Sequence, residues 1–153
     1  MASQDEKATV PSIRLKRAYE SPESADGVRV LVDRLWARGV SKENAALDAW
    51  MKELGPSDEL RTWFGHRPKR WDAFVDKYRR ELSTPLRQLL LAELQGIAGG
   101  RTLTLVYGAR DTKQNEAVVL RHYLLHDSPR TDATWDGPDQ TSGYGGGRGS
   151  GSP

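Results

Sequence analysis

VRVLVDR at residues 28–34 and LTLVYGARD at residues 103–111 decide the fold of this chain. Each begins as an apolar run rich in β-branched residues, which is typical of a buried strand, and each ends in an adjoining arginine and aspartate. A helical region separates the two runs, and strands joined by a helical crossover are usually parallel neighbours. Ligands of open α/β sheets bind beyond the carboxyl ends of the strands. The repeated arginine–aspartate ending therefore predicts a ligand pocket.

The flanking segments indicate a small α/β protein. IRLKRAY at residues 13–19 alternates apolar and basic side chains, as a half-exposed strand does. Apolar residues at helical spacing predict a helix from Ser41 to Gly55, and further helices after Ser57, Pro68, Thr84 and either Asp111 or Thr112. The fold class predicted is α/β: one small domain with a mostly parallel sheet of three or four strands, flanked by about five helices.

Length and composition favour a single domain. The chain has 153 residues, of which 37% are hydrophobic, so it is long enough for one core and too short for two ordinary domains. We expect a flexible N-terminus at residues 1–12 and the α/β domain at residues 13–127. Residues 128–153 end in TSGYGGGRGSGSP, which is too rich in glycine and serine to bury a core, and this predicts a disordered tail.

Charge and cysteine content exclude several classes of protein. The 23 basic and 21 acidic side chains leave a net charge of +2, too little for a bulk nucleic-acid coat. The absence of cysteine excludes disulfides, thiolate catalysis and cysteine-ligated metals, and it fits a reducing compartment. The N-terminus has no apolar stretch, and no segment approaches the roughly 20 apolar residues of a membrane span. We therefore expect a cytoplasmic protein that does not bind membranes.

The two strand endings supply the candidate site. Arginine suits phosphate or carboxylate because its five donors can bind two oxygens at once, and the start of a following helix adds backbone N–H groups. The ligand expected is a small anion that carries phosphate, such as a nucleotide. No catalytic residue, cofactor or metal is assigned, and the oligomeric state is left open. The predicted ligand-binding residues are Asp33, Arg34, Trp36, Arg38, Tyr107, Arg110, Asp111 and Asn115.

An equally weighted alternative is purely structural. Asp33 and Asp111 would pair with the neighbouring arginines, and Asp111 would cap the last helix. If the protein is an enzyme, hydrolysis or transfer at a phosphate ester is the natural class, with one of these aspartates as the base.

A nucleic-acid binding module is a further alternative. It would use Lys16 and Arg17 of the first strand and the basic loop at residues 67–70. Basic residues on an edge strand more often only prevent aggregation. The tryptophans Trp50, Trp63 and Trp71 fall on helical apolar stripes, which favours core packing over base stacking. His122 and His126 are four residues apart, but no clear third metal ligand accompanies them.

Longer segments carry a family resemblance. These are IRLKRAYESP, DGVRVLVDRLWARGVSKENAALDAWMKELGPSDELRTWF and LTLVYGARDTKQNEAVVL. Residues 13–125 resemble the YeaO-like family, domain of unknown function 488. The resemblance implies a small bacterial α/β protein whose biochemical role is unassigned. Glu116 stands where the family pattern leads us to expect a histidine, and a glutamate would need a raised pKa to move protons near neutral pH.

Overall fold

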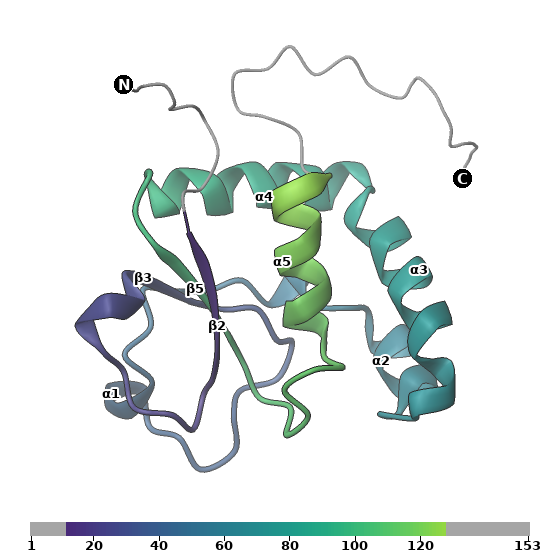
Figure 1. Cartoon of the computed structure of the whole chain (residues 1–153), viewed down its shortest axis with the longest axis horizontal. Coiled ribbons are helices and arrows are strands. Elements are labelled where there is room, and N and C mark those ends of the chain that lie inside the picture. The colour runs from purple at the N-terminus through teal and green to yellow at the C-terminus, as the bar shows by residue number, and fades with distance from the viewer. Residues whose placement is uncertain (1–11, 128–153) are drawn as a thin grey trace.

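A computed structural model describes residues 12–127, which form a four-stranded parallel sheet (Figure 1). The strands are β2 (Ile13–Arg17), β5 (Leu103–Tyr107), β3 (Val28–Leu31) and β4 (Ala49–Trp50), in that spatial order. The sheet confirms the predicted fold class. Of the predicted flexible terminus only Ser12 is described, and the predicted tail lies outside the described residues.

Five α-helices accompany the sheet in the described residues: α1 (Lys42–Ala45), α2 (Asp58–Phe64), α3 (Trp71–Leu82), α4 (Pro85–Ala98) and α5 (Glu116–His126). Short 3₁₀ turns occur at Ser24–Asp26, Lys52–Leu54 and Pro68–Arg70. In Figure 1 the strands β2 and β5 run toward the lower edge of the molecule, where α2 and the loop leading into α5 also lie. Within residues 12–127, no helix has both the length and the apolar character needed to cross a membrane.

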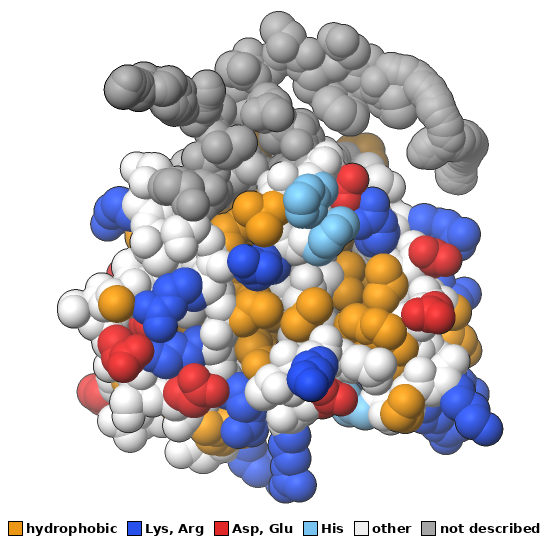
Figure 2. All heavy atoms as spheres, in the orientation of Figure 1, with side chains coloured by type: hydrophobic (Ala, Val, Ile, Leu, Met, Phe, Trp, Pro, Cys, Tyr) orange, Lys and Arg blue, Asp and Glu red, His pale blue; other side chains and the backbone are white. Residues whose placement is uncertain are grey.

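Alternation along the strands gives the sheet two different faces. Val28, Val30 and Val32 belong to the main core with Phe74 and Tyr78 of α3, both of which are almost fully buried. Leu31 and Val106 point the other way, into a smaller cluster covered by residues 36–47. Figure 2 shows hydrophobic side chains at the surface on both sides of α5, and histidines over its C-terminal end. The burial pattern explains why both central strands read as continuous apolar runs.

The helix predicted from Ser41 to Gly55 is wrong. Ser41 does cap a helix, but α1 ends at Ala45 and the backbone of Ala46 is left-handed. The chain then joins the sheet edge: the amide of Met51 donates to the carbonyl of Leu31, and β4 pairs with β3. Trp50, expected in the core, is 39% exposed. Backbone pairing with an existing strand outweighed the helical spacing of the apolar residues.

A buried ion-pair network lies on the second face of the sheet. Asp26 is fully buried and its Oδ2 lies 2.7 Å from Nη1 of Arg29 and 3.1 Å from Nζ of Lys16. Burial acts to raise the pKa of the Asp26 carboxyl, but hydrogen bonds from the Glu23 amide, Lys16 and Arg29 outweigh it and lower that pKa. Lys16 is therefore neither an exposed edge residue nor available to a nucleic acid.

We expect the Asp26→Ala variant to lose about 3–5 kcal/mol of unfolding free energy, because Arg29 would be left buried without a counter-charge and Lys16 would keep only Glu23, which is largely exposed. Asp58→Ala is the matched control. It removes the exposed Arg61–Asp58 pair and should cost at most about 1 kcal/mol. Urea denaturation measures both, and similar losses for the two variants would contradict the assignment.

Candidate functional site

The two strand endings converge, as the sequence predicted. β3 and β5 are parallel neighbours, and the amide of Val32 donates to the carbonyl of Val106 at 3.0 Å. Just beyond the strands, Oδ2 of Asp33 accepts a hydrogen bond from the backbone N–H of Gly108 at 2.9 Å. This bond ties the two exit loops together. A hollow of about 490 Å³ lies beside it, at the carboxyl end of the sheet.

Four of the eight predicted site residues line this hollow, namely Asp33, Trp36, Arg38 and Asn115. Trp36 donates from Nε1 to the carbonyl of Val40, and its ring meets the edge of Trp50. Asn115 caps α5 through a bond from the amide of Val118, and its Nδ2 donates to the carbonyl of Asp111. Trp36 and Asn115 therefore shape the walls, since their polar atoms are already engaged.

The other four predicted residues lie outside the lining. Arg34 donates from Nε to the carbonyl of Pro56 at 2.6 Å, and Tyr107 is buried at the end of β5, where desolvation raises the pKa of its hydroxyl. Arg110 is exposed. Asp111 accepts from the amides of Lys113 and Gln114, and these bonds lower the pKa of its carboxyl. Asp111 thus shapes the loop before α5.

The structure does not show the purely structural alternative, in which the two aspartates pair with the neighbouring arginines and Asp111 caps the last helix. Asn115 caps the last helix, so the prediction that Asp111 does so is wrong. None of the ion pairs among residues 12–127 joins Asp33 or Asp111 to Arg34, Arg38 or Arg110. The arginines at the strand endings are therefore not neutralised by the adjoining aspartates.

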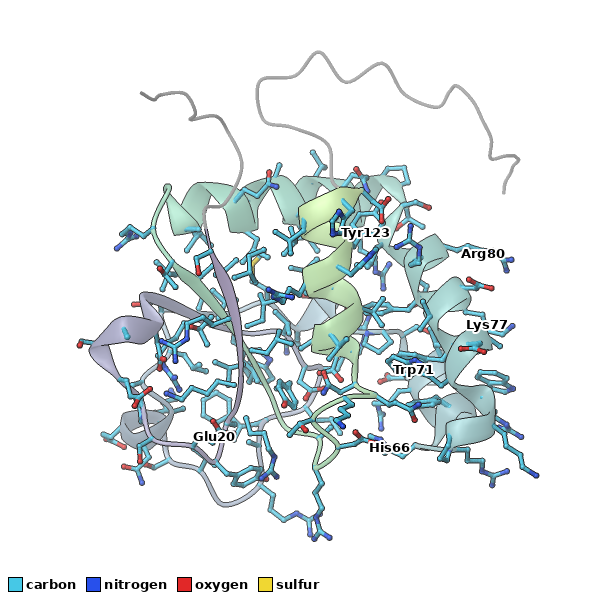
Figure 3. All side chains as sticks on the ribbon, viewed as in Figure 1. Glu20, His66, Trp71, Lys77, Arg80 and Tyr123 are labelled. Atoms are coloured by element: carbon cyan, nitrogen blue, oxygen red, sulfur yellow. The ribbon has the colours of Figure 1, made fainter. Side chains whose placement is uncertain are left out.

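The hollow also has lining residues outside the predicted set, including Arg61, Phe64, His66 and Glu116. Phe64 and Arg61 belong to α2, and His66 follows it with a left-handed backbone. Figure 3 shows His66 toward the lower edge of the molecule, on the side of the loop that leads into α5. No strand-ending pattern marks α2. From the sequence, His66 could be a catalytic base or an exposed turn residue, with the turn favoured, and nothing there indicated which loop it would face.

Glu116 and Asp33 form a pair of carboxyl groups in the lining. Glu116 is 8% exposed, and its Oε2 has no hydrogen-bond donor among the described residues. Burial, followed by the charge of Asp33, raises the pKa of the Glu116 carboxyl well above its ordinary value. The protonated form of Glu116 is therefore favoured, and a proton can be shared between the two groups. The raised pKa is what a glutamate at this position was expected to need.

Two guanidinium groups face the same hollow. Arg38 is exposed and makes neither a hydrogen bond nor an ion pair with another described residue. Arg61 contacts Asp58 through Nη2 at 3.2 Å, but its Nε is buried and has no acceptor in the described part of the chain. Both arginines thus keep donors that an anion can use.

Other groups in the described residues offer less. Within residues 12–127, no set of three histidine, cysteine, aspartate or glutamate side chains is placed to hold a metal. The rings of His122 and His126 lie 4.4 Å apart on the exposed side of α5. In the basic loop, Arg70 packs over the ring of Trp63 and donates to its carbonyl. Trp63 and Trp71 pack against the main core, as predicted.

Sequence comparisons place the chain among known proteins. The family model described as "Inactive DUF488-N3 subclade" matches residues 12–143. The chain belongs to this family. It is 42% identical over 113 residues to the uncharacterized protein YeaO of Escherichia coli K12. The matched segment is 74% of this chain and 96% of YeaO. The family assignment confirms the resemblance found in the sequence.

An uncharacterized protein of Mycobacterium tuberculosis strain H37Rv is 38% identical over 112 residues, or 73% of this chain and 92% of that protein. No solved structure matches the chain.

The carboxyl pair predicts a specific pH dependence of stability. Because folded Glu116 holds its proton more tightly than the unfolded chain does, unfolding free energy should fall as pH rises above the ordinary pKa of 4.5 and until the folded pKa is passed. The limiting slope for one proton is about 1.4 kcal/mol per pH unit. Glu116→Gln should remove this contribution, and urea denaturation between about pH 5 and pH 8 measures it.

The control for this measurement is Glu93→Gln, on the exposed surface of α4, which should leave the pH profile of unfolding unchanged. Parallel profiles for the wild-type protein and Glu116→Gln would show that Glu116 does not hold an extra proton in the folded state.

Proposed function

We propose that the hollow at the carboxyl ends of β3 and β5 binds a small anionic ligand that carries a phosphate group. The observation that carries the proposal is Arg38, a guanidinium that lines the hollow without a partner in the described residues. An arginine held beside a concave surface with free donors suits the paired oxygens of phosphate or carboxylate. The volume of about 490 Å³ falls within the range of small-molecule sites.

The charge balance of the lining supports an anion. In the empty site Glu116 is favoured in its protonated form, so Arg38 and Arg61 face the single negative charge of Asp33 in the lining, although Arg61 is also paired with the exposed Asp58 outside it. The free Nε of Arg61 adds a second donor, and its position on α2 differs from that of Arg38 on the loop after β3. Donors from two separate elements can hold one phosphate from two sides.

Binding without catalysis is the favoured form of this proposal. The description of the family as an inactive subclade supports a binding role over phosphate-ester hydrolysis or transfer. For the nucleic-acid alternative, Lys16 is buried in its ion pairs and Arg17 donates to the carbonyl of Ala109, so two of the proposed contacts are already used.

The test is a calorimetric titration with ribose 5-phosphate. Arg38→Ala should weaken binding by about tenfold or more, since a hydrogen bond to a charged group contributes roughly 1.5–3 kcal/mol. Its melting temperature should stay unchanged, because Arg38 is exposed and supports no described contact. Arg110→Ala is the matched control: it removes an exposed arginine outside the lining and should bind like the wild-type protein. Equal losses in both variants would point to general charge attraction, and no binding by the wild-type protein would refute the proposal.

A further inference from the structure

We propose that the ligand of this hollow carries a flat heterocycle with adjacent ring N–H and amino donors, as guanine does, and that Glu116 and Asp33 recognise this edge. The inference rests on the proposed function, because the arginines would hold the phosphate of the same molecule. It adds a ligand class to that site: a nucleoside monophosphate whose base presents two neighbouring donors.

The first argument is an excess of acceptors. Oε2 of Glu116 is buried without a donor from the described residues, although Glu116 lines the hollow. The side chain beside it is Asp33, another acceptor, and Oδ2 of Asp33 takes its hydrogen bond from the Gly108 amide. Buried polar groups are rarely left without a partner, and those that are call for a ligand, a water or an ion. In the empty site the proton that the pair holds is the donor between Glu116 and Asp33. A ligand edge with two N–H groups can replace that proton and give each carboxylate a donor of its own.

The second argument is the chemistry of the walls. Trp36 lines the hollow from the loop after β3 and is partly exposed. Phe64 of α2 and Phe74 of α3 also line it, but they stack on each other in the core and add little exposed surface. Aromatic rings in a site favour a flat, polarisable ligand body over an aliphatic one. Acceptors, aromatic walls and free guanidinium groups together match the three parts of a nucleotide: the donor edge, the base plane and the phosphate. A plain sugar phosphate would leave the acceptors and the rings unused.

The third argument concerns the proton held by the carboxyl pair. A donor edge needs Glu116 to accept, so the proton that the pair retains in the empty site must leave to solvent when the base binds. The titratable groups that act on Glu116 are Asp33 from the loop after β3, and Tyr78 and Tyr107 from α3 and β5. None of these groups is cationic, and the cations of the lining, Arg38 and Arg61, are not among the groups that shift the pKa of Glu116. Binding of the base should therefore release more protons than binding of phosphate alone, which releases only the fraction of a proton that the phosphate monoester itself still carries.

Titration calorimetry of the full chain with guanosine monophosphate, inosine monophosphate and ribose 5-phosphate tests the inference. The expected order of affinity is guanosine over inosine monophosphate by at least about tenfold, since inosine lacks the amino donor. Repeating each titration in two buffers with different heats of ionisation measures the protons released. Release with guanosine monophosphate should exceed release with ribose 5-phosphate, because the phosphate contributes equally to both and only the base displaces the proton of the carboxyl pair.

Glu116→Gln is the matched variant, because the amide keeps the shape of the side chain and removes its charge. It should lose the preference for guanosine monophosphate and the extra proton release, yet bind ribose 5-phosphate as the wild-type protein does. Glu93→Gln, on the exposed surface of α4, should change none of these values. If Glu116→Gln does not fold, the comparison of the three ligands on the wild-type protein still decides the question.

The outcomes separate this inference from the function on which it rests. Equal binding of all three compounds, or binding of guanosine monophosphate with no more proton release than ribose 5-phosphate, overturns the base-recognition inference and leaves the phosphate site standing. Equal affinities for guanosine and guanosine monophosphate would support recognition of the base by the carboxyl pair. They would overturn the phosphate site, because the phosphate would then add nothing to binding. No binding of any compound overturns both.

Discussion

Parallel pairing of β3 with β5 is the constraint on which the rest of this structure depends. It places Asp33 beside Gly108, so residues separated by 75 positions in the chain share one hydrogen bond at 2.9 Å. The loop after β3 then carries Trp36 and Arg38 toward the lining, and the loop after β5 leads directly into α5 with Glu116 in its first turn. A change of register between these strands would separate the two carboxyl groups as well as the walls around them.

The sequence was sufficient for those parts of the fold in which local pattern and tertiary packing agree. The apolar runs of β3 and β5 predicted buried strands, and capping residues such as Ser57, with Gly65 after α2, marked real helix ends. The helix prediction was wrong for residues 46–54. Their apolar spacing fits a helix, but the open edge of β3 offers backbone hydrogen-bond partners that the chain uses instead. The spacing of apolar residues gives no information about such partners, because they come from a distant part of the chain.

The residues of the candidate site also fall into those that the sequence could predict and those that it could not. Residues directly at the strand exits, such as Asp33 and Arg38, could be predicted because the carboxyl ends of parallel strands meet at one edge. Side-chain direction could not be predicted: Arg34 turns to the Pro56 carbonyl and Arg110 faces solvent. Arg61 and Phe64 line the hollow because α2 packs against α3 and the main core, which brings it to this end of the sheet. Glu116 was noticed as an unusual residue, but its partner was not.

Asp26 has a consequence for the way the sheet opens. Its side chain holds Lys16 of β2 and Arg29 of β3, while its carbonyl accepts from the hydroxyl of Thr104 in β5. A terminal edge strand ordinarily frays on its own, but detachment of β2 here would strip a cation from a buried carboxylate. Opening of the edge strand β2 is therefore coupled to opening of the central strands β3 and β5. Amide hydrogens of β2 should exchange with solvent at rates close to those of β3 and β5.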